Sequence, residues 1–202
     1  MPTRIGATLA ATLATLMLAA LISSASARNL SISNQQIRSA FRSIEIGAEG
    51  LGTQRCDLTL EGSLHSRTML KVVNSLMGYI TRVNTANCSL TMAILSLPWH
   101  VRYVGFSGTL PNITLLMVKI SRFSFSFGSF GFVCLGEPEV ETNFNREAGG
   151  RLTELRITAI PTLPLRSGGG FGCPSSTGNF RAPTAGTVTL LGNSNDISVT
   201  LI

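Results

Sequence analysis

Apolar and polar residues alternate with a period of two along much of the chain. Cys56, Leu58 and Leu60 are each followed by a polar residue, as in a strand with one buried face. The same alternation recurs in residues 99–104 and 151–160. The pattern therefore predicts a chain built mainly from β-strands.

Two segments fit more than one structure. Residues 34–46 match helical spacing or an edge strand, and we favour the strand. Residues 68–83 repeat apolar positions every four residues, but Gly78 and the β-branched residues favour two short strands. Both interpretations increase the expected number of strands.

Two apolar runs and several turn signals complete the pattern. Residues 88–97 predict a strand buried on both sides in the middle of a sandwich, and residues 113–120 predict a long apolar strand. Stretches rich in Gly, Pro, Ser or Glu predict turns or loops at 105–108, 110–112, 137–150 and 161–183. The last residues predict a hairpin with its turn at 192–196.

These elements define the fold class. About ten to twelve short strands separated by turns predict an all-β protein, either an antiparallel β-sandwich or, as the alternative, a closed β-barrel. An outer-membrane barrel fits less well, because four cysteines and apolar runs without alternation are typical of a packed core.

Aromatic residues concentrate between residues 96 and 127. At alternate positions they would share a strand face and could line a pocket for an apolar ligand, although the core face of a sheet is the commoner use of such a stripe. The candidate ligand-binding residues are Trp99, Tyr103, Phe123, Phe125 and Phe127.

The N-terminal segment predicts export. Arg4 precedes an apolar run, and residues 25–27 read Ala-Ser-Ala, which is typical of a signal-peptide cleavage site after Ala27. We therefore expect a signal peptide over 1–27, one secreted extracellular domain over 28–202, and no transmembrane segment after cleavage.

Four cysteines in an exported chain predict two disulfide bonds. Three pairings are open, and we favour Cys56 with Cys88 and Cys134 with Cys173, because each pair brackets a compact group of expected strands. No Cys/His spacing typical of a zinc site occurs.

Charge excludes one class of partner. The net charge is +6, but the basic residues are spread singly and do not alternate with aromatic residues, so we expect no nucleic-acid binding. A cell-envelope polymer or another protein remains a possible partner.

Candidate chemistry is sparse. His65 and His100 could each act as a general base beside a carboxylate, although isolated strand histidines are commonly structural. Glu137, Glu139 and Glu141 could hold a metal, but they lack a calcium-loop pattern and fit a solvated acidic loop better. We expect no cofactor.

The stretches LPWHVRYVGFSGTLPNIT, LTLEGSLHSRT and MGYITR resemble a group of uncharacterised small secreted proteins of actinobacteria, over Arg55 to Phe125. The resemblance implies bacterial secretion and brings no catalytic residue or ligand.

Three functions follow as hypotheses. The first is a non-enzymatic, disulfide-stabilised protein that binds or has a structural role at the cell surface. The second is a barrel that carries a small apolar ligand, and the third is a small secreted hydrolase.

Overall fold

The structure is a computed structural model that describes residues 29–109, 112–146, 151–192 and 197–201. The expected signal peptide lies outside these residues. The described chain forms sixteen strands and no helix. The strands are β1 (Asn29–Ile32), β2 (Gln36–Ala48), β3 (Gly52–Leu64), β4 (Thr68–Leu70), β5 (Leu76–Ala86), β6 (Thr91–Leu95), β7 (Trp99–Thr109), β8 (Asn112–Ser121), β9 (Ser124–Ser129), β10 (Phe132–Gly136), β11 (Val140–Arg146), β12 (Arg151–Ile157), β13 (Ile160–Gly170), β14 (Thr177–Arg181), β15 (Gly186–Leu190) and β16 (Ile197–Leu201).

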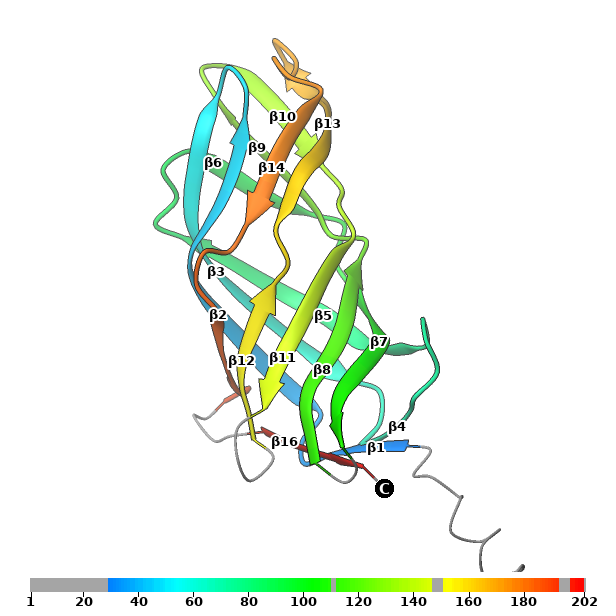
Figure 1. The fold of residues 1–202 in the computed structure, drawn as a ribbon. Coiled ribbons are helices and arrows are strands. Elements are labelled where there is room, and N and C mark those ends of the chain that lie inside the picture. The colour runs from blue at the N-terminus through cyan, green and yellow to red at the C-terminus, as the bar shows by residue number, and fades with distance from the viewer. Residues whose placement is uncertain (1–28, 110–111, 147–150, 193–196, 202) are drawn as a thin grey trace, which may run out of the picture.

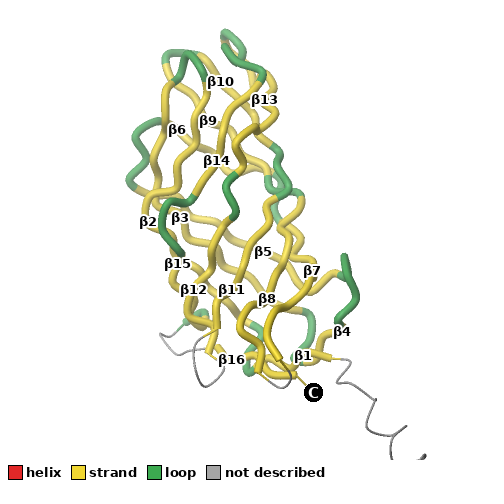
Figure 2. Tube along the Cα trace, viewed as in Figure 1, coloured by secondary structure: helices red, strands yellow, loops and turns green. Residues whose placement is uncertain are grey.

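Eight of the strands close into an antiparallel barrel, so the barrel alternative describes this part of the fold. Its strands follow the order β12, β11, β8, β7, β5, β3, β2 and β15. The pairing of β15 with both β2 and β12 closes the ring. Figures 1 and 2 show the barrel as one half of an elongated molecule, with β1, β4 and β16 across its far end.

The other half of the molecule is a sheet that continues from β2. Its order is β2, β14, β13, β10, β9 and β6, and all pairs are antiparallel. We call this part the upper sheet, because it lies above the barrel in Figure 1. Strand β2 belongs to both halves: its first residues pair with β15 and its last residues pair with β14.

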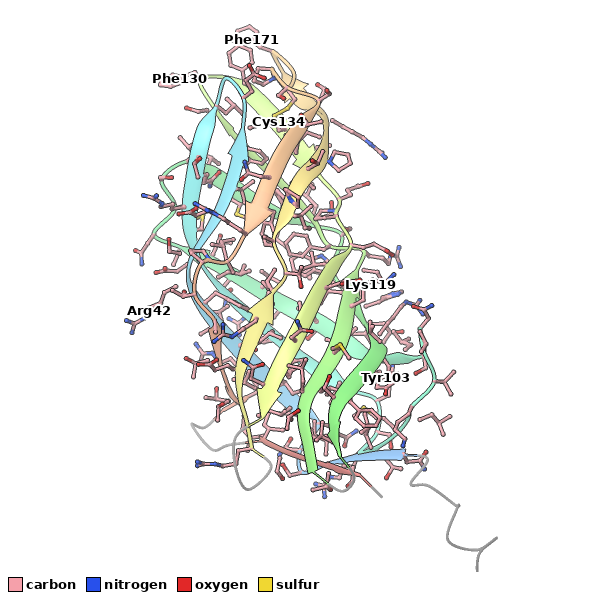
Figure 3. The ribbon with its side chains drawn as sticks, viewed as in Figure 1. Arg42, Tyr103, Lys119, Phe130, Cys134 and Phe171 are labelled. Atoms are coloured by element: carbon pink, nitrogen blue, oxygen red, sulfur yellow. A yellow bond between two sulfur atoms is a disulfide. The ribbon has the colours of Figure 1, made fainter. Side chains whose placement is uncertain are left out.

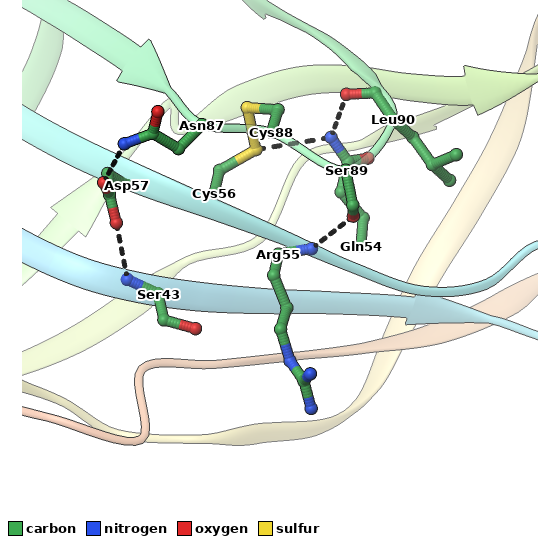
Figure 4. The surroundings of a disulfide bond; sticks show 9 residues. All are labelled: Ser43, Gln54, Arg55, Cys56, Asp57, Asn87, Cys88, Ser89 and Leu90. Carbon is green, nitrogen blue, oxygen red and sulfur yellow. Dashed lines mark hydrogen bonds between the residues drawn. A yellow bond between two sulfur atoms is a disulfide. The ribbon is translucent and has the colours of Figure 1, made fainter.

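A β-bulge marks the passage of β2 from the barrel to the upper sheet. The register against β3 shifts between Phe41 and Ile44, and Ser43 lies there at a positive φ of 61°. The N–H of Ser43 donates to a carboxylate oxygen of Asp57 at 3.1 Å, and Asn87 donates to the other oxygen at 2.6 Å (Figure 4). Asp57 therefore supplies a hydrogen-bond acceptor for the backbone N–H of Ser43, which lies at the irregular point of the β2–β3 ladder.

Both predicted disulfides are confirmed. Cys56 is bonded to Cys88, and Cys134 is bonded to Cys173. The first bond ties β3 to the segment that leads into β6, next to Gln54, whose side-chain amide donates to the carbonyl of Leu90 at 2.8 Å (Figure 4). The second ties β10 to the loop after β13.

The two halves have different cores. The barrel is filled mainly by aliphatic side chains, whereas the upper sheet has an aromatic core. Phe123 contacts both Trp99 and Phe180, with ring centroids 4.3 Å and 5.4 Å apart. Phe125 and Phe127 continue this row with centroids 6.0 Å apart, and all five rings are buried.

The strand favoured at 34–46 and the strand predicted around Cys56, Leu58 and Leu60 are confirmed as β2 and β3. The two strands favoured within 68–83 are confirmed as β4 and β5, although β5 is longer than expected and continues to Ala86. Some loop predictions are wrong. Residues 105–108 lie inside β7, residues 137–150 contain β11, and residues 161–183 contain most of β13 and all of β14. Glycine, proline and acidic residues mark turns only as a tendency, and pairing with neighbouring strands overrides it here.

Two predictions about strand position are also wrong. The run at 88–97 contains β6, which is the edge strand of the upper sheet and is only partly buried. The last two strands do not pair as a hairpin, because β15 pairs with β2 and β12, whereas β16 pairs with β1 and β12. The expected turn at 192–196 begins at Gly192, which has a positive φ of 93°, and its other residues lie outside the described part of the chain.

Candidate functional site

The barrel encloses an apolar cavity of about 60 Å³. Seven of the barrel strands contribute to its wall, and Ile32 of β1 contributes from the covered end. Leu116, Val118 and Ile120 line it from β8 because every second side chain of that strand faces inward. The wall is therefore a direct product of the alternation visible in the sequence.

The cavity is larger than the space that one missing methyl group would leave in a packed core. A single water molecule needs about 10–15 Å³ in the same measure, so the cavity accommodates roughly four to six atoms of that size. An apolar wall favours a hydrocarbon chain over water, because water in such a site would lack hydrogen-bond partners.

One side chain in the wall carries a free polar group. Ser39 on β2 is only 2% exposed, lines the cavity, and its hydroxyl has no hydrogen-bond partner among the described residues. The hydroxyl of Thr142, also in the wall, differs because it donates to the carbonyl of Val118 at 3.3 Å. Ser39 can therefore give one hydrogen bond to a molecule in an otherwise apolar cavity.

Sequence reasoning did not single out Ser39. The signal was present, because Ile37, Ser39 and Phe41 occupy alternate positions of one strand and the serine interrupts an apolar face. The segment also matched helical spacing, and this ambiguity concealed the face to which Ser39 belongs.

The predicted aromatic ligand residues lie elsewhere. Trp99, Phe123, Phe125 and Phe127 pack in the core of the upper sheet, and neither they nor Tyr103 line the barrel cavity. Trp99 donates its indole N–H to the carbonyl of Leu95 at 3.2 Å. These side chains have a packing role in the structure.

Tyr103 is buried on β7 opposite Val118 of β8. Burial raises the pKa of its phenol. Its backbone anchors the loop between β4 and β5: the carbonyl of Tyr103 accepts from the N–H of Asn74, and its N–H donates to the carbonyl of Ser75. Figure 3 shows Tyr103 at this side of the barrel.

The two candidate histidines lie on either side of one tyrosine ring. The ring centroid of Tyr79 is 4.9 Å from that of His65 and 5.2 Å from that of His100. Burial lowers the pKa of His100, and the charges of Arg122 and Arg102 lower it further. Within the described chain neither imidazole makes a hydrogen bond or ion pair, so the structure shows no acid–base pair at this position.

The three candidate metal-binding glutamates take part in separate contacts. Glu139 accepts from the ammonium of Lys119 at 2.8 Å, and Glu137 lies 3.8 Å from Arg166. Glu141 shares an open surface hollow with Lys119 and Glu139. In the part of the chain that the structure describes, no three His, Cys, Asp or Glu side chains are placed to hold a metal ion.

The most buried carboxylate of the described chain has two basic partners. Glu45 on β2 accepts from Arg181 at 2.5 Å and from Arg55 at 2.9 Å. These two hydrogen bonds, that of Arg181 first, lower the pKa of Glu45. Because both oxygens are occupied, this group stabilises the junction between the two halves and offers no site to a ligand.

Together these features define a disulfide-bonded all-β protein, built on a closed eight-stranded barrel with an attached sheet and an apolar cavity inside the barrel. No known protein family, curated protein or solved structure matches the chain. Among the described residues there is no helix with the length and hydrophobicity needed to span a membrane.

Proposed function

We propose that this chain is an extracellular, non-catalytic binding protein whose barrel takes up a short aliphatic molecule with one hydrogen-bonding group, such as a small alcohol. The observation that carries the proposal is the buried Ser39 hydroxyl, which has no partner among the described residues and lies in the wall of an apolar cavity. Two disulfides support an extracellular location, since such bonds persist in oxidising compartments.

The cavity sets the size and the affinity of the ligand. Its volume suits a chain of about four to six non-hydrogen atoms. Even the best small ligands gain at most about 1.5 kcal/mol of binding free energy per non-hydrogen atom. We therefore expect a dissociation constant in the micromolar to millimolar range.

Titration with n-butanol, followed by amide chemical shifts in NMR spectra, tests the proposal. We expect saturable shifts at residues around the cavity and none in the upper sheet. Val118→Ile adds one methylene group to the cavity wall and should weaken binding several-fold. Val188→Ile is the matched control, because Val188 is a buried barrel residue outside the cavity wall.

Ser39→Ala tests the hydrogen bond separately. This variant should bind n-butanol more weakly than the unaltered protein and n-pentane about equally well. Shifts that never saturate, or equal losses in the Val118 and Val188 variants, would contradict binding inside the barrel.

A hydrolase is not supported by comparable geometry, because neither candidate imidazole is hydrogen-bonded to a described carboxylate or hydroxyl. The proposed extracellular location also rests on the N-terminal segment. N-terminal sequencing of protein recovered from the medium of the producing cells should begin at Arg28, and an intact Met1 would overturn the proposed cleavage.

A further inference from the structure

Two phenylalanine side chains project from the end of the upper sheet farthest from the barrel. Phe130 lies in the turn between β9 and β10, and Phe171 follows β13. Their exposed fractions are 92% and 78%, the highest among the large apolar residues of the described chain. Figure 3 shows both at this end, which we call the aromatic tip.

Hydrogen bonds, a ring contact and a disulfide support the tip. The N–H of Phe171 donates to the carbonyl of Gly131 at 2.9 Å, and the N–H of Val133 donates to the carbonyl of Gly172 at 2.9 Å. The ring of Phe171 contacts that of Phe132 with centroids 5.6 Å apart, and the Cys134–Cys173 disulfide lies directly behind. The exposed rings are therefore presented by a cross-linked, hydrogen-bonded support.

Phe130 occupies a backbone position that does not suit it. Phe130 and Gly131 both have positive φ, at 52° and 83°, as in the two-residue turns that prefer Asn-Gly. A bulky residue is disfavoured there, and its ring makes no compensating burial. A strained and exposed aromatic residue contributes little to folding, which points to a role in contact with another molecule.

The surroundings of the tip carry almost no charge. The chain has 26 acidic and basic residues, yet none falls in 85–98, 123–136 or 167–180. These segments hold β6, β9, β10 and most of β14. The neighbouring β2–β3 turn contributes Glu49, and beside it a Cβ on Gly50 would lie 3.2 Å from Pro174. The next charges along β10 and β13 are Glu137 and Arg166, which lie 3.8 Å apart and offset each other, so Glu49 is the unpaired charge that these contacts place beside the tip.

We propose that the aromatic tip inserts into the surface of a phospholipid bilayer with neutral, zwitterionic headgroups. Uncharged segments enter the bilayer interface without the cost of burying charge. The backbone hydrogen bonds of Phe171, Gly172 and Val133 lower the cost of moving these groups out of water. Glu49 disfavours an anionic surface.

The size of the tip distinguishes a bilayer from a protein partner. A stable protein interface buries about 800 Å² on each side, which two projecting rings on a narrow, convex end do not supply. A bilayer needs no complementary shape, and each ring that leaves water should strengthen partitioning by about tenfold or more. The tip lies on the upper sheet, so this inference is independent of ligand binding in the barrel.

A tryptophan probe tests insertion directly. The single native tryptophan, Trp99, is fully buried, so Phe130→Trp adds one exposed indole to a constant background. With phosphatidylcholine vesicles we expect a blue shift of the added emission and quenching by brominated acyl chains. Unchanged emission would overturn the proposal.

Vesicle sedimentation measures the contribution of each ring. Phe130→Asn suits the turn and keeps the fold, and it should reduce partitioning into phosphatidylcholine vesicles about tenfold, as should Phe171→Ser. The matched control is the pair Val72→Ser and Val73→Ser, two exposed apolar residues near the barrel, which should have no effect. All variants have the same N-terminus, so differences between them report on the tip.

Four results would overturn the inference. Partitioning could be unaffected by the Phe130 and Phe171 variants, or lost equally in the valine control. Binding could require phosphatidylglycerol and disappear at high salt, which would indicate attraction by the positive net charge. The tip could instead bury itself in a second protein molecule, which cross-linking of the protein without vesicles would detect.

Discussion

Arg181 of β14 donates a hydrogen bond to Glu45 of β2 at 2.5 Å, although 136 residues separate them in sequence. Arg55 of β3 donates to the other oxygen of the same carboxylate. Three adjacent strands are thus joined by one buried anion at the point where the barrel passes into the upper sheet.

This relationship predicts a specific pH dependence. Hydrogen bonds from Arg181 and Arg55 lower the pKa of Glu45, so its ionised form favours the folded state. Its contribution should be complete above the ordinary glutamate pKa of about 4.3 and should disappear as the pH falls through the lowered value. Glu45→Gln should reduce stability at pH 7, and the difference should shrink in acid.

Urea unfolding monitored between pH 7 and pH 2 measures this effect. Glu137→Gln is the control, because Glu137 is exposed and lies 3.8 Å from its arginine, so its loss should change little at any pH. Equal behaviour of the two variants would contradict a stabilising role for Glu45.

His100 provides a second pH prediction. Burial and the charges of Arg122 and Arg102 lower its pKa, so protonation disfavours the folded state. The stabilising contribution of the neutral ring is complete above about pH 6.5 and is lost as the pH falls through the lowered pKa. NMR titration should place the midpoint of His100 below 6.5, and Arg122→Asn should raise it.

Two substitutions in the cavity wall should have opposite effects on stability. Ser39→Ala removes a buried hydroxyl that has no partner among the described residues, so it should raise the free energy of unfolding by about 1 kcal/mol in the absence of ligand. Thr142→Val removes a hydroxyl that is hydrogen-bonded to the carbonyl of Val118, so this variant should lower the free energy of unfolding by a similar amount. Chemical denaturation measures both; a loss of stability in Ser39→Ala would mean that its hydroxyl is satisfied.

Each disulfide should contribute substantially to stability. The bonds close loops with sequence separations of 32 and 39 residues, for which chain entropy predicts about 3–4 kcal/mol each. Replacing Cys56 and Cys88 by alanine should lower the free energy of unfolding by this amount. Intact mass after alkylation, with and without reductant, provides the independent check: labelling of the unreduced, denatured protein would show free thiols.

Local features of this fold could be read from the sequence. Alternation at Cys56, Leu58 and Leu60 defines β3 because the two faces of a strand meet different environments. The disulfide pairing was also predicted correctly, although the strands between Cys134 and Cys173 divide between the barrel (β11 and β12) and the upper sheet (β10 and β13). The strand prediction depends only on residues close in sequence, whereas the disulfide prediction was a choice among three pairings of distant cysteines.

Features that depend on distant partners could not be read in this way. Barrel closure rests on a short pairing of β15 with β12, between Gly186 and Leu155 and between Thr187 and Glu154, and nothing in either segment specifies the other. The run at 88–97 is apolar whether its strand is central or at an edge. Its position is set by the pairing of β6 with β9 alone.

The candidate site has the same limitation. Phe125 and Phe127 lie at alternate buried positions of β9 as predicted, whereas Phe123 precedes that strand. Only the structure shows that Trp99 contacts Phe123 and that Phe180 contacts Phe123 and Phe125. The position of Ser39 in a cavity wall likewise requires knowledge of the strands opposite.

The continuity of β2 and β3 has a mechanical consequence. Each is an unbroken strand of 13 residues that belongs to the barrel at one end and lies beside the upper sheet at the other. Because the β2–β3 ladder runs through both halves, the upper sheet cannot swing against the barrel without distorting this ladder. The two halves should therefore move as one rigid body, with no hinge between them.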